Sequence, residues 1–323
     1  MAQPITVRVG NLSNADADGI SASQIAAGAQ PLVLNGALTN GQTANNVAQS
    51  QSPGSASDLT LNGTLASGGV AYLYGRKIYI TSAGDDSGVT FTVTGQAYGT
   101  VGGPFAVTET ITGANASVVS SVNSYYTISK IHISGASAAA VTVGAGGLAV
   151  LDHARRVIIT STGDETGITF TISGTDASGY PISEVVAGKA IAAASSVLDY
   201  KTVSSVVTSG ATTDTVTVGT NGVAASPWVR FDDYAANAQI AVQATVTGTV
   251  NYTVQQTMQD PNDSANPVAP ADVVWLDSPD TSNLVGQTAT KFGTYPIAPI
   301  FARVLLNSGT GSVSTVFRQV YLA

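Results

Sequence analysis

A segment of the chain occurs twice in tandem, and this duplication limits the fold more than any other feature of the sequence. Residues 76–95, RKIYITSAGDDSGVTFTVTG, return 79 positions later as RRVIITSTGDETGITFTISG. Beyond Pro104 and Pro181 the offset becomes 75, so that residues 141–144 return as 216–219. Both copies keep alternation and glycine but no reactive group. Duplication of a chemically quiet unit lengthens a chain and enlarges its surface, which is typical of a building material.

The spacing of apolar residues predicts that each copy consists of short β-strands. Residues 78–82 form one expected strand, residues 83–88 a turn with two acids between glycines, and residues 89–94 a second strand. In the second strand valine and phenylalanine alternate with threonine, and a period of two is that of a strand with one buried face. β-Branched side chains fit such a surface. We therefore predict an all-β protein whose duplicated middle part forms two tandem β-sandwich-like units.

The sequence on either side of the repeats differs from them in character. Residues 40–57 hold almost no apolar anchor, and alone they bury too little surface to offset the entropy of ordering. We expect an extended N-terminal arm that is mobile or lies on a neighbouring subunit, with a strand at residues 5–9 and a short helical piece at residues 22–28. The expected domains are residues 1–70 (arm), 71–148 and 149–223 (repeats) and 224–323 (C-terminal domain).

The C-terminal domain is expected to be a β-sandwich or jelly-roll-like domain, because several short strands follow one another at short spacing. Residues 238–257 resemble a hairpin around a glycine turn, and residues 300–321 resemble a second one around a Ser-Gly-Thr-Gly turn. A polar loop with three prolines covers residues 260–271. The candidate core anchors are Trp228, Trp275, Phe301 and Phe317.

The composition argues against several classes of partner. Charged residues make up 10% of the chain and the net charge is −8, whereas an average globular chain is about 25% charged. Basic residues are scattered, so we expect no nucleic-acid partner. There is no cysteine, which excludes disulfides and thiolate metal sites. The start lacks the pattern of a secretory signal, and the uncharged stretch 133–151 is rich in Ser, Thr and Gly, which favours a strand pair over a membrane span. We expect a soluble protein made in a cytoplasm.

Two segments resemble calcium loops. Asn14, Asp16 and Asp18 place oxygen ligands at positions 1, 3 and 5 before a glycine, but position 12 is Ile25 instead of glutamate. The bland interpretation is a polar turn with an Asp cap. The loop Asp260-Pro261-Asn262-Asp263 could also bind calcium, and a solvated turn is its default interpretation.

Acidic residues also recur at matching positions of the two repeats. Asp85-Asp86 and Asp164-Glu165 could act as an acid–base pair or hold a hard cation, but they equally suit turns in which the carboxylate accepts hydrogen bonds from its own backbone. Glu109 and Glu184 are equivalent as well, and an ion pair with Arg76 or Arg155 would be structural.

Nothing in the sequence assembles a catalytic centre. His132 and His153 stand alone, and no serine lies in a nucleophile elbow. Zinc would need more ligands. The glycine-rich residues 99–103 lack the lysine of a phosphate loop. We predict no enzyme activity, no catalytic, cofactor-binding or metal residues, and no cofactor.

Several stretches resemble a widespread group of tailed-bacteriophage virion proteins, similar to small capsid cement or decoration domains of jelly-roll type. They cover residues 21–36, 61–71, 84–95, 246–255, 299–303 and 308–313, together with Trp228. Members of this group carry one copy of the middle unit, whereas this chain has two. The resemblance implies a structural role in a virion and no catalytic residues.

From the resemblance we expect a decoration or cement protein on the outside of a phage head, with the major capsid protein and sister subunits, in a trimer, as partners. Each subunit would add modest contacts that symmetry multiplies. A head-fibre, collar or tail-associated protein is the alternative location. Another class is a module that binds host glycan by stacking sugars on tyrosines. The available candidates are Tyr98, Tyr125, Tyr126 and Tyr180.

Overall fold

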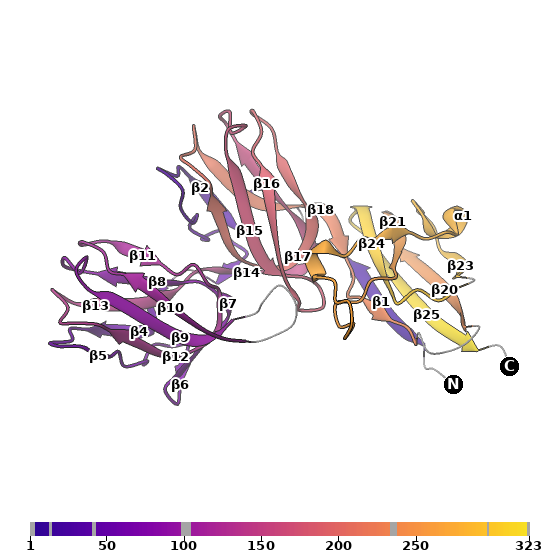
Figure 1. Ribbon diagram of the computed structural model, residues 1–323. Coiled ribbons are helices and arrows are strands. Elements are labelled where there is room, and N and C mark those ends of the chain that lie inside the picture. The colour runs from indigo at the N-terminus through magenta and orange to yellow at the C-terminus, as the bar shows by residue number, and fades with distance from the viewer. Residues whose placement is uncertain are drawn as a thin grey trace.

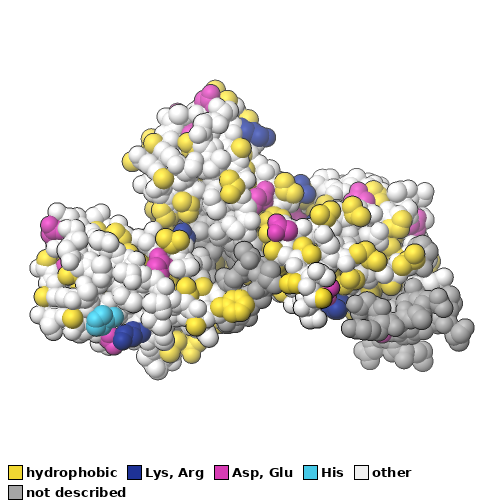
Figure 2. Space-filling view, viewed as in Figure 1, with side chains coloured by type: hydrophobic (Ala, Val, Ile, Leu, Met, Phe, Trp, Pro, Cys, Tyr) yellow, Lys and Arg dark blue, Asp and Glu magenta, His cyan; other side chains and the backbone are white. Residues whose placement is uncertain are grey.

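The protein is built almost entirely from antiparallel β-strands, as the sequence predicts. The computed structural model describes residues 4–12, 15–40, 43–97, 105–232, 238–295 and 297–321. Figure 1 shows three lobes, which we call units I, II and III in the order of the repeats and the C-terminal part. In the face shown in Figure 2 most charged side chains are scattered among uncharged ones, while a dark blue, a magenta and a cyan side chain lie together at the lower left. The all-β, sandwich-type prediction is confirmed.

Unit I is a sandwich of two sheets. Its strands are β4 (Thr43–Gln51), β5 (Ser57–Asp58), β6 (Ala66–Ser67), β7 (Val70–Arg76), β8 (Ile78–Ser82), β9 (Thr90–Ala97), β10 (Phe105–Thr112), β11 (Val118–Ser120), β12 (Tyr125–Ile133) and β13 (Val141–Ala145). One sheet has the order β10-β9-β12-β7-β6 and the other β11-β8-β13-β4. Along β9, Phe91 and Val93 are buried between the sheets while the threonines stay partly exposed. The strands expected at residues 78–82 and 89–94 are confirmed.

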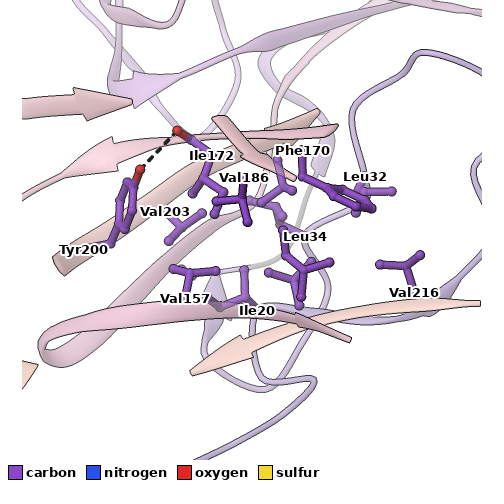
Figure 3. Close-up of a cluster of buried hydrophobic side chains, with 14 of the residues drawn as sticks. Ile20, Leu32, Leu34, Val157, Phe170, Ile172, Val186, Tyr200, Val203 and Val216 are labelled. Carbon is purple, nitrogen blue, oxygen red and sulfur yellow. Dashed lines mark hydrogen bonds between the residues drawn. The ribbon is translucent and has the colours of Figure 1, made fainter. Parts of the chain in front are cut away.

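Unit II repeats this sandwich with longer strands. They are β2 (Ser21–Gln24), β3 (Thr39–Asn40), β14 (Leu148–Ser161), β15 (Thr169–Thr175), β16 (Pro181–Ala187), β17 (Ala194–Thr208) and β18 (Val216–Ala225). At the repeat offsets β14 corresponds to β7 and β8 together, and β17 corresponds to β11 and β12 together. Segments that form two separate strands in unit I thus form one continuous strand in unit II. Figure 3 shows Ile20 and Leu34, from the N-terminal segment, packed with Val157, Phe170 and Ile172 of the repeat.

Unit III is the C-terminal sandwich. Its elements are β1 (Ile5–Gly10), β19 (Val229–Arg230), β20 (Ala238–Thr247), β21 (Val250–Thr257), the 3-10 helix η1 (Pro270–Asp272), β22 (Leu276–Asp277), α1 (Thr281–Leu284), β23 (Lys291–Tyr295), β24 (Phe301–Gly309) and β25 (Ser312–Tyr321). One sheet has the order β1-β25-β20-β23. In the other, β24 pairs with β21, and also with β18 at Ala224 and Ala225, so a sheet of unit II continues into unit III.

The two hairpins predicted in unit III are wrong. β20 pairs with β23 and β25, whereas β21 pairs with β22 and β24. β24 and β25 likewise belong to different sheets. Each glycine turn therefore carries the chain across the sandwich instead of back along one sheet, with Gly248 at a φ of +77°. Alternation and turn glycines are the same for both connections, which is why the sequence does not separate them.

The N-terminal residues do not form the separate arm that we expected. β1 pairs with β25 of unit III, β2 with β18 and β3 with β14 of unit II, and β4 with β13 of unit I. The chain thus passes through the units in the order III, II, I and returns through I, II, III. Unit I is continuous in sequence, unit II is assembled on both sides of it, and unit III on both sides of unit II. In Figure 1 the indigo β1 lies among the orange and yellow strands.

The polar part of this segment is ordered because its backbone completes a sheet of the same chain. β4 has only Val47 and Ala48 as buried apolar anchors, and it is held by pairing with β13, where Oδ1 of Asn46 also accepts the N–H of Ala145 at 2.6 Å. The helical piece predicted at residues 22–28 is also wrong. Pairing with β18 makes Ser21–Gln24 a strand, a case of tertiary structure overriding local propensity.

The N-terminal segment contains a second, shorter repeat. LNGALTN at residues 34–40 matches LNGTLAS at residues 61–67. The N–H of Gly36 donates to the carbonyl of Ile20 at 3.2 Å, and that of Gly63 donates to the carbonyl of Val47 at 3.1 Å. A Cβ at Gly63 would lie 2.1 Å from the Asn46 backbone, so this approach requires glycine. We call residues 15–40 strap II and residues 43–67 strap I, because each completes the unit of that number.

Candidate functional site

The same end of units I and II forms a cleft against the unit that follows. The I/II cleft is lined from unit I by Gly75, Ala97, Val122, Asn123 and Ser124. At the repeat offsets these positions correspond to Ala154, Asp176, Val197, Leu198 and Asp199, which line the II/III cleft. Two positions that are Ala and Ser in the first copy are therefore aspartates in the second. The II/III cleft encloses about 410 Å³ and is the place where charged and aromatic side chains converge.

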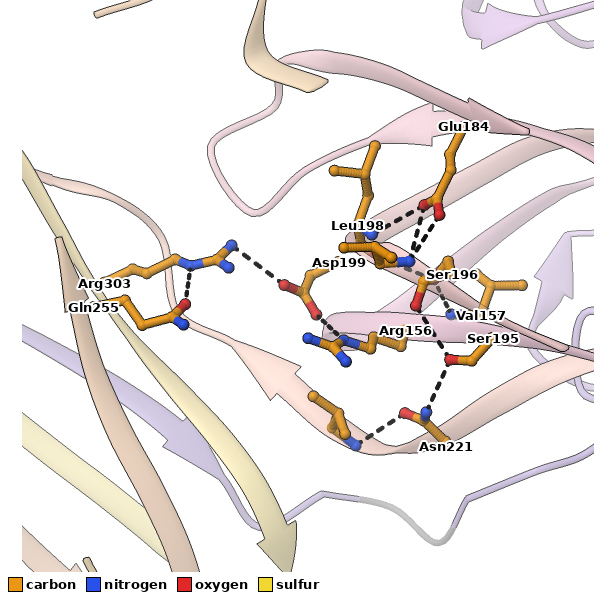
Figure 4. A network of polar contacts seen from close by, with 12 residues as sticks. Arg156, Val157, Glu184, Ser195, Ser196, Leu198, Asp199, Asn221, Gln255 and Arg303 are labelled. Atoms are coloured by element: carbon orange, nitrogen blue, oxygen red, sulfur yellow. Dashed lines mark hydrogen bonds and ion pairs between the residues drawn. The ribbon is translucent and has the colours of Figure 1, made fainter. Parts of the chain in front are cut away.

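Asp199 sits between two arginines from different units (Figure 4). Its Oδ2 lies 3.2 Å from an Arg303 guanidinium nitrogen of unit III, and its Oδ1 lies 3.7 Å from Nε of Arg156 of unit II. The Nε of Arg303 donates to Oε1 of Gln255 at 3.0 Å. Burial raises the pKa of Asp199, and the charges of Arg303 and Arg156 oppose that shift. The group links units II and III electrostatically.

Asp176, in the turn after β15, brings a second buried carboxylate to the cleft. Only 6% of the residue is exposed. Its Oδ1 accepts the N–H groups of Ser178 at 2.8 Å and Tyr180 at 2.9 Å, which fixes the plane of the carboxylate. Its Oδ2 is buried and accepts no hydrogen bond from the described part of the chain. Burial raises the pKa of Asp176 to about 6, although these backbone hydrogen bonds and the charge of Arg303 act in the opposite direction.

Two tryptophans form the aromatic side of the cleft. The ring centroids of Trp228 and Trp275 lie 5.0 Å apart, and the two rings are arranged edge to face. The guanidinium carbon of Arg303 lies 4.4 Å from the centroid of the Trp275 ring, a cation–π distance. Phe301 and Phe317 are buried, as predicted for core anchors. Both tryptophans are only partly buried and line the cleft, so their prediction as core residues is wrong.

The two acids of each pair differ in burial and in the hydrogen bonds that they accept. Asp164 is exposed, and its Oδ1 accepts the N–H of Thr166 at 3.0 Å, as Asp85 does for its own turn. The second acid is buried. Glu165 accepts the N–H of Thr213 at 3.0 Å, and Asp86 accepts that of Ala138 at 2.7 Å. Although burial raises the pKa of Glu165, its hydrogen bonds hold it below the ordinary value. The pairs thus tie two loops of each unit together.

The recurring glutamates have a backbone role. Glu184 accepts the N–H groups of Val197 at 2.8 Å and Leu198 at 3.0 Å, and Glu109 accepts those at the equivalent bend of unit I. Arg155 instead forms two bonds of 2.6 Å with the carboxylate of Asp152. The ion pair between Arg155 and Glu184 that the matching repeat positions made possible is not seen among the described residues. The carboxylate of Glu109 receives Asn123 and the hydroxyl of Tyr125.

Each histidine lies beside an aspartate of its own unit. Nδ1 of His132 is 2.7 Å from Oδ1 of Asp58, and this hydrogen bond holds the pKa of Asp58 below its ordinary value. Nδ1 of His153 is 3.8 Å from Oδ2 of Asp152, and burial lowers the pKa of His153. The two histidines lie on strands of different units, β12 and β14.

The calcium candidates adopt turn geometry. Asn14 lies outside the described residues, and Oδ1 of Asp16 accepts the N–H of Asp18 at 3.3 Å. Asp260 forms an ion pair of 2.6 Å with Arg230, and Asp263 accepts N–H groups of its own turn. Within the described ranges, no cluster of three or more His, Asp or Glu side chains could hold a metal ion.

The described tyrosines that were proposed for glycan stacking have different surroundings. Tyr98 and residues 99–103 lie outside the described residues. Tyr125 is buried, and Tyr126 lines the I/II cleft. Tyr180 packs 5.7 Å from Trp228, beside the II/III cleft, and its hydroxyl accepts a hydrogen bond from Asn262.

The residues that sequence reasoning missed are Asp176, Asp199 and Arg303. A signal for the two aspartates was present, because they replace Ala97 and Ser124 in an otherwise parallel duplication. No comparable signal marks Arg303, which lies among mostly apolar residues of β24.

Comparison with known proteins identified no matching family model, no matching curated protein and no matching solved structure. Among the helices of the described residues, none has the length and apolarity that a membrane crossing requires.

Proposed function

We propose that this chain is a structural component of a phage virion, a decoration or cement protein attached to the outside of the head. The proposal rests mainly on the nested path of the chain, which passes through units III, II and I and then returns through I, II and III. The chain crosses each junction twice, and the II/III junction adds a shared sheet and the buried ion pair between Arg303 and Asp199. Such a path suits a permanent scaffold. The sequence resemblance to phage virion proteins is the reason to propose that this scaffold belongs to a virion.

The surface also suits attachment through many weak contacts. Large apolar side chains are exposed singly on all three units, including Val122 and Val197, which are 80% and 70% exposed at equivalent positions of the repeats. Single exposed apolar residues are ordinary on monomers, but symmetric repetition would multiply their small contributions. The proposed partners are the major capsid protein and sister subunits in a trimer. With few charges on the chain, attachment should persist at high salt.

Electron cryomicroscopy of intact particles that carry the protein tests this function. Hundreds of copies on the shell would support decoration, with trimers expected at threefold positions. A few to a few dozen copies at a vertex, neck or tail would keep the virion role and replace decoration by the alternative location. A chain absent from purified particles would contradict the virion role. Release of the protein by moderate salt would contradict the proposed apolar attachment.

A further inference from the structure

We propose that the II/III cleft binds a neutral saccharide between its tryptophans and its buried carboxylate. This inference concerns a ligand of the chain itself and does not depend on the place of the protein in a particle. The cleft volume of about 410 Å³ lies within the usual range for small-ligand sites.

The first reason is an unmet hydrogen-bond acceptor. Oδ2 of Asp176 is buried in the cleft wall without a donor from the described residues, while Oδ1 is fixed by two N–H groups. A buried acceptor without a partner is unfavourable, and most such groups in proteins are paired. The carboxylate is therefore held in a defined orientation, and its second oxygen has no hydrogen-bond partner among the described residues. A ligand hydroxyl would supply the missing donor.

The second reason is a buried donor on a residue that lines the same cleft. Nε of Arg156 is buried and makes no hydrogen bond within the described residues, although it forms the 3.7 Å ion pair with Asp199. The wall of the cleft thus contains both an acceptor and a donor that lack a hydrogen bond within the described residues. Neighbouring hydroxyls of a sugar can donate to one group and accept from the other.

The third reason is the balance of charge and the aromatic wall. Two arginines and three aspartates line the cleft, namely Arg156, Arg303, Asp176, Asp199 and Asp272. Because opposite charges of similar number line the cleft, it should bind neither strongly anionic nor strongly cationic ligands. Trp228 and Trp275 supply ring surface on which the C–H face of a sugar packs. A neutral ligand with polar edges and an apolar face fits this combination.

The repeat provides an internal comparison. The equivalent end of unit I has Ala97 and Ser124 where unit II has Asp176 and Asp199, and unit III supplies the tryptophans only to the II/III cleft. Asp272 borders both clefts, but Asp176, Asp199 and the two arginines line only the II/III cleft, so they are not a consequence of the repeated fold.

The test uses tryptophan fluorescence of the full-length protein, because the chain contains only two tryptophans and both line this cleft. The purified protein is titrated with glucose, galactose, mannose and N-acetylglucosamine, and then with their short oligomers. We expect a saturable fluorescence change with a dissociation constant in the millimolar range for at least one sugar. Asp176→Asn, which keeps the shape of the side chain, should weaken that sugar about tenfold, since it loses a charged acceptor. Asp164→Asn, in an exposed turn far from the tryptophans in sequence, is the matched control and should bind normally.

Saturation-transfer NMR with the same sugars gives a second readout that does not depend on the emission of the variants. No saturable response to any of the sugars in either measurement would overturn the proposal. Equal binding by the Asp176→Asn protein would also overturn it, as would saturable binding of inorganic phosphate or methylammonium in place of sugars. Neither result would bear on the copy number of the protein in particles, so the two proposals fail independently.

Discussion

Unit I should fold when residues 43–147 are expressed alone, whereas residues 71–148 should not. The two fragments share the whole first repeat and differ in strap I. Nested threading makes unit I the one unit whose strands are all consecutive in sequence, since units II and III take strands from before and after it. The boundaries expected from the repeats alone would predict that residues 71–148 suffice.

The magnitude follows from what strap I buries. Val47 is fully buried and Leu59 is 4% exposed, both in the core of unit I. Burying a valine or leucine side chain contributes about 1.5–3 kcal/mol, so these two alone contribute about 3–6 kcal/mol. The fragment without the strap also leaves the edge of β13 unpaired. A domain has a total stability of about 5–15 kcal/mol, so this loss removes most or all of it.

Far-UV circular dichroism with urea and thermal unfolding measures the difference, because both tryptophans lie outside unit I. Residues 43–147 should give a β-rich spectrum and one cooperative transition, and residues 71–148 should give neither. Residues 148–225, which lack strap II, are a second test. They should remain unfolded alone and gain β-structure when a peptide of residues 15–40 is added. Cooperative unfolding of residues 71–148 with the same midpoint as residues 43–147 would refute the reasoning.

Three further predictions concern buried carboxylates. Because the pKa of Asp176 is raised to about 6, its ionisation in the folded state lowers stability as pH rises from about 4 to 6. Asp176→Asn should therefore be more stable than wild type by about 2–3 kcal/mol at pH 8 and no more stable at pH 4, and urea unfolding at both values that shows no pH-dependent difference would contradict this. Asp199→Ser leaves Arg303 without its carboxylate and should cost about 3–5 kcal/mol in urea unfolding followed by tryptophan fluorescence, so a loss below about 1 kcal/mol would mean that the pair is not effectively buried. Glu165→Gln should cost about 1–3 kcal/mol through its lost hydrogen bonds and Asp164→Asn less, and the reverse order would show that the exposed acid holds the turn.

The sequence predicts the strands of the repeats well because each strand carries its own pattern. Alternating Phe91 and Val93 define both the period and the buried face of β9. Strap residues carry no such pattern, since β4 buries only two apolar residues, Val47 and Ala48, and depends on backbone bonds to β13. Pairing partners are likewise hidden, because a ladder between distant segments leaves no trace in local periodicity. This is why the arm, the short helix and the two hairpins were predicted wrongly.

The candidate cleft was hidden for a related reason. It is formed by two units whose relative position depends on the nested path, and sequence proximity gives no hint that Asp199 and Arg303 meet. What the sequence does contain is the difference between the copies. Where the first copy has Ala97 and Ser124, the second copy has Asp176 and Asp199, while the strand pattern around these positions is the same.

Nesting also explains why the two clefts should behave differently. Every junction is crossed by two chain segments, which limits the relative motion of the units. At the II/III junction β18 pairs with β24, and Asp199 lies buried between Arg156 and Arg303. At the I/II cleft the lining from the first repeat is uncharged, with Ala97 and Ser124 at the corresponding positions. Because bending at the II/III junction would break a ladder and separate buried charges, units II and III should move as one body. The remaining freedom of the molecule is then concentrated between that body and unit I.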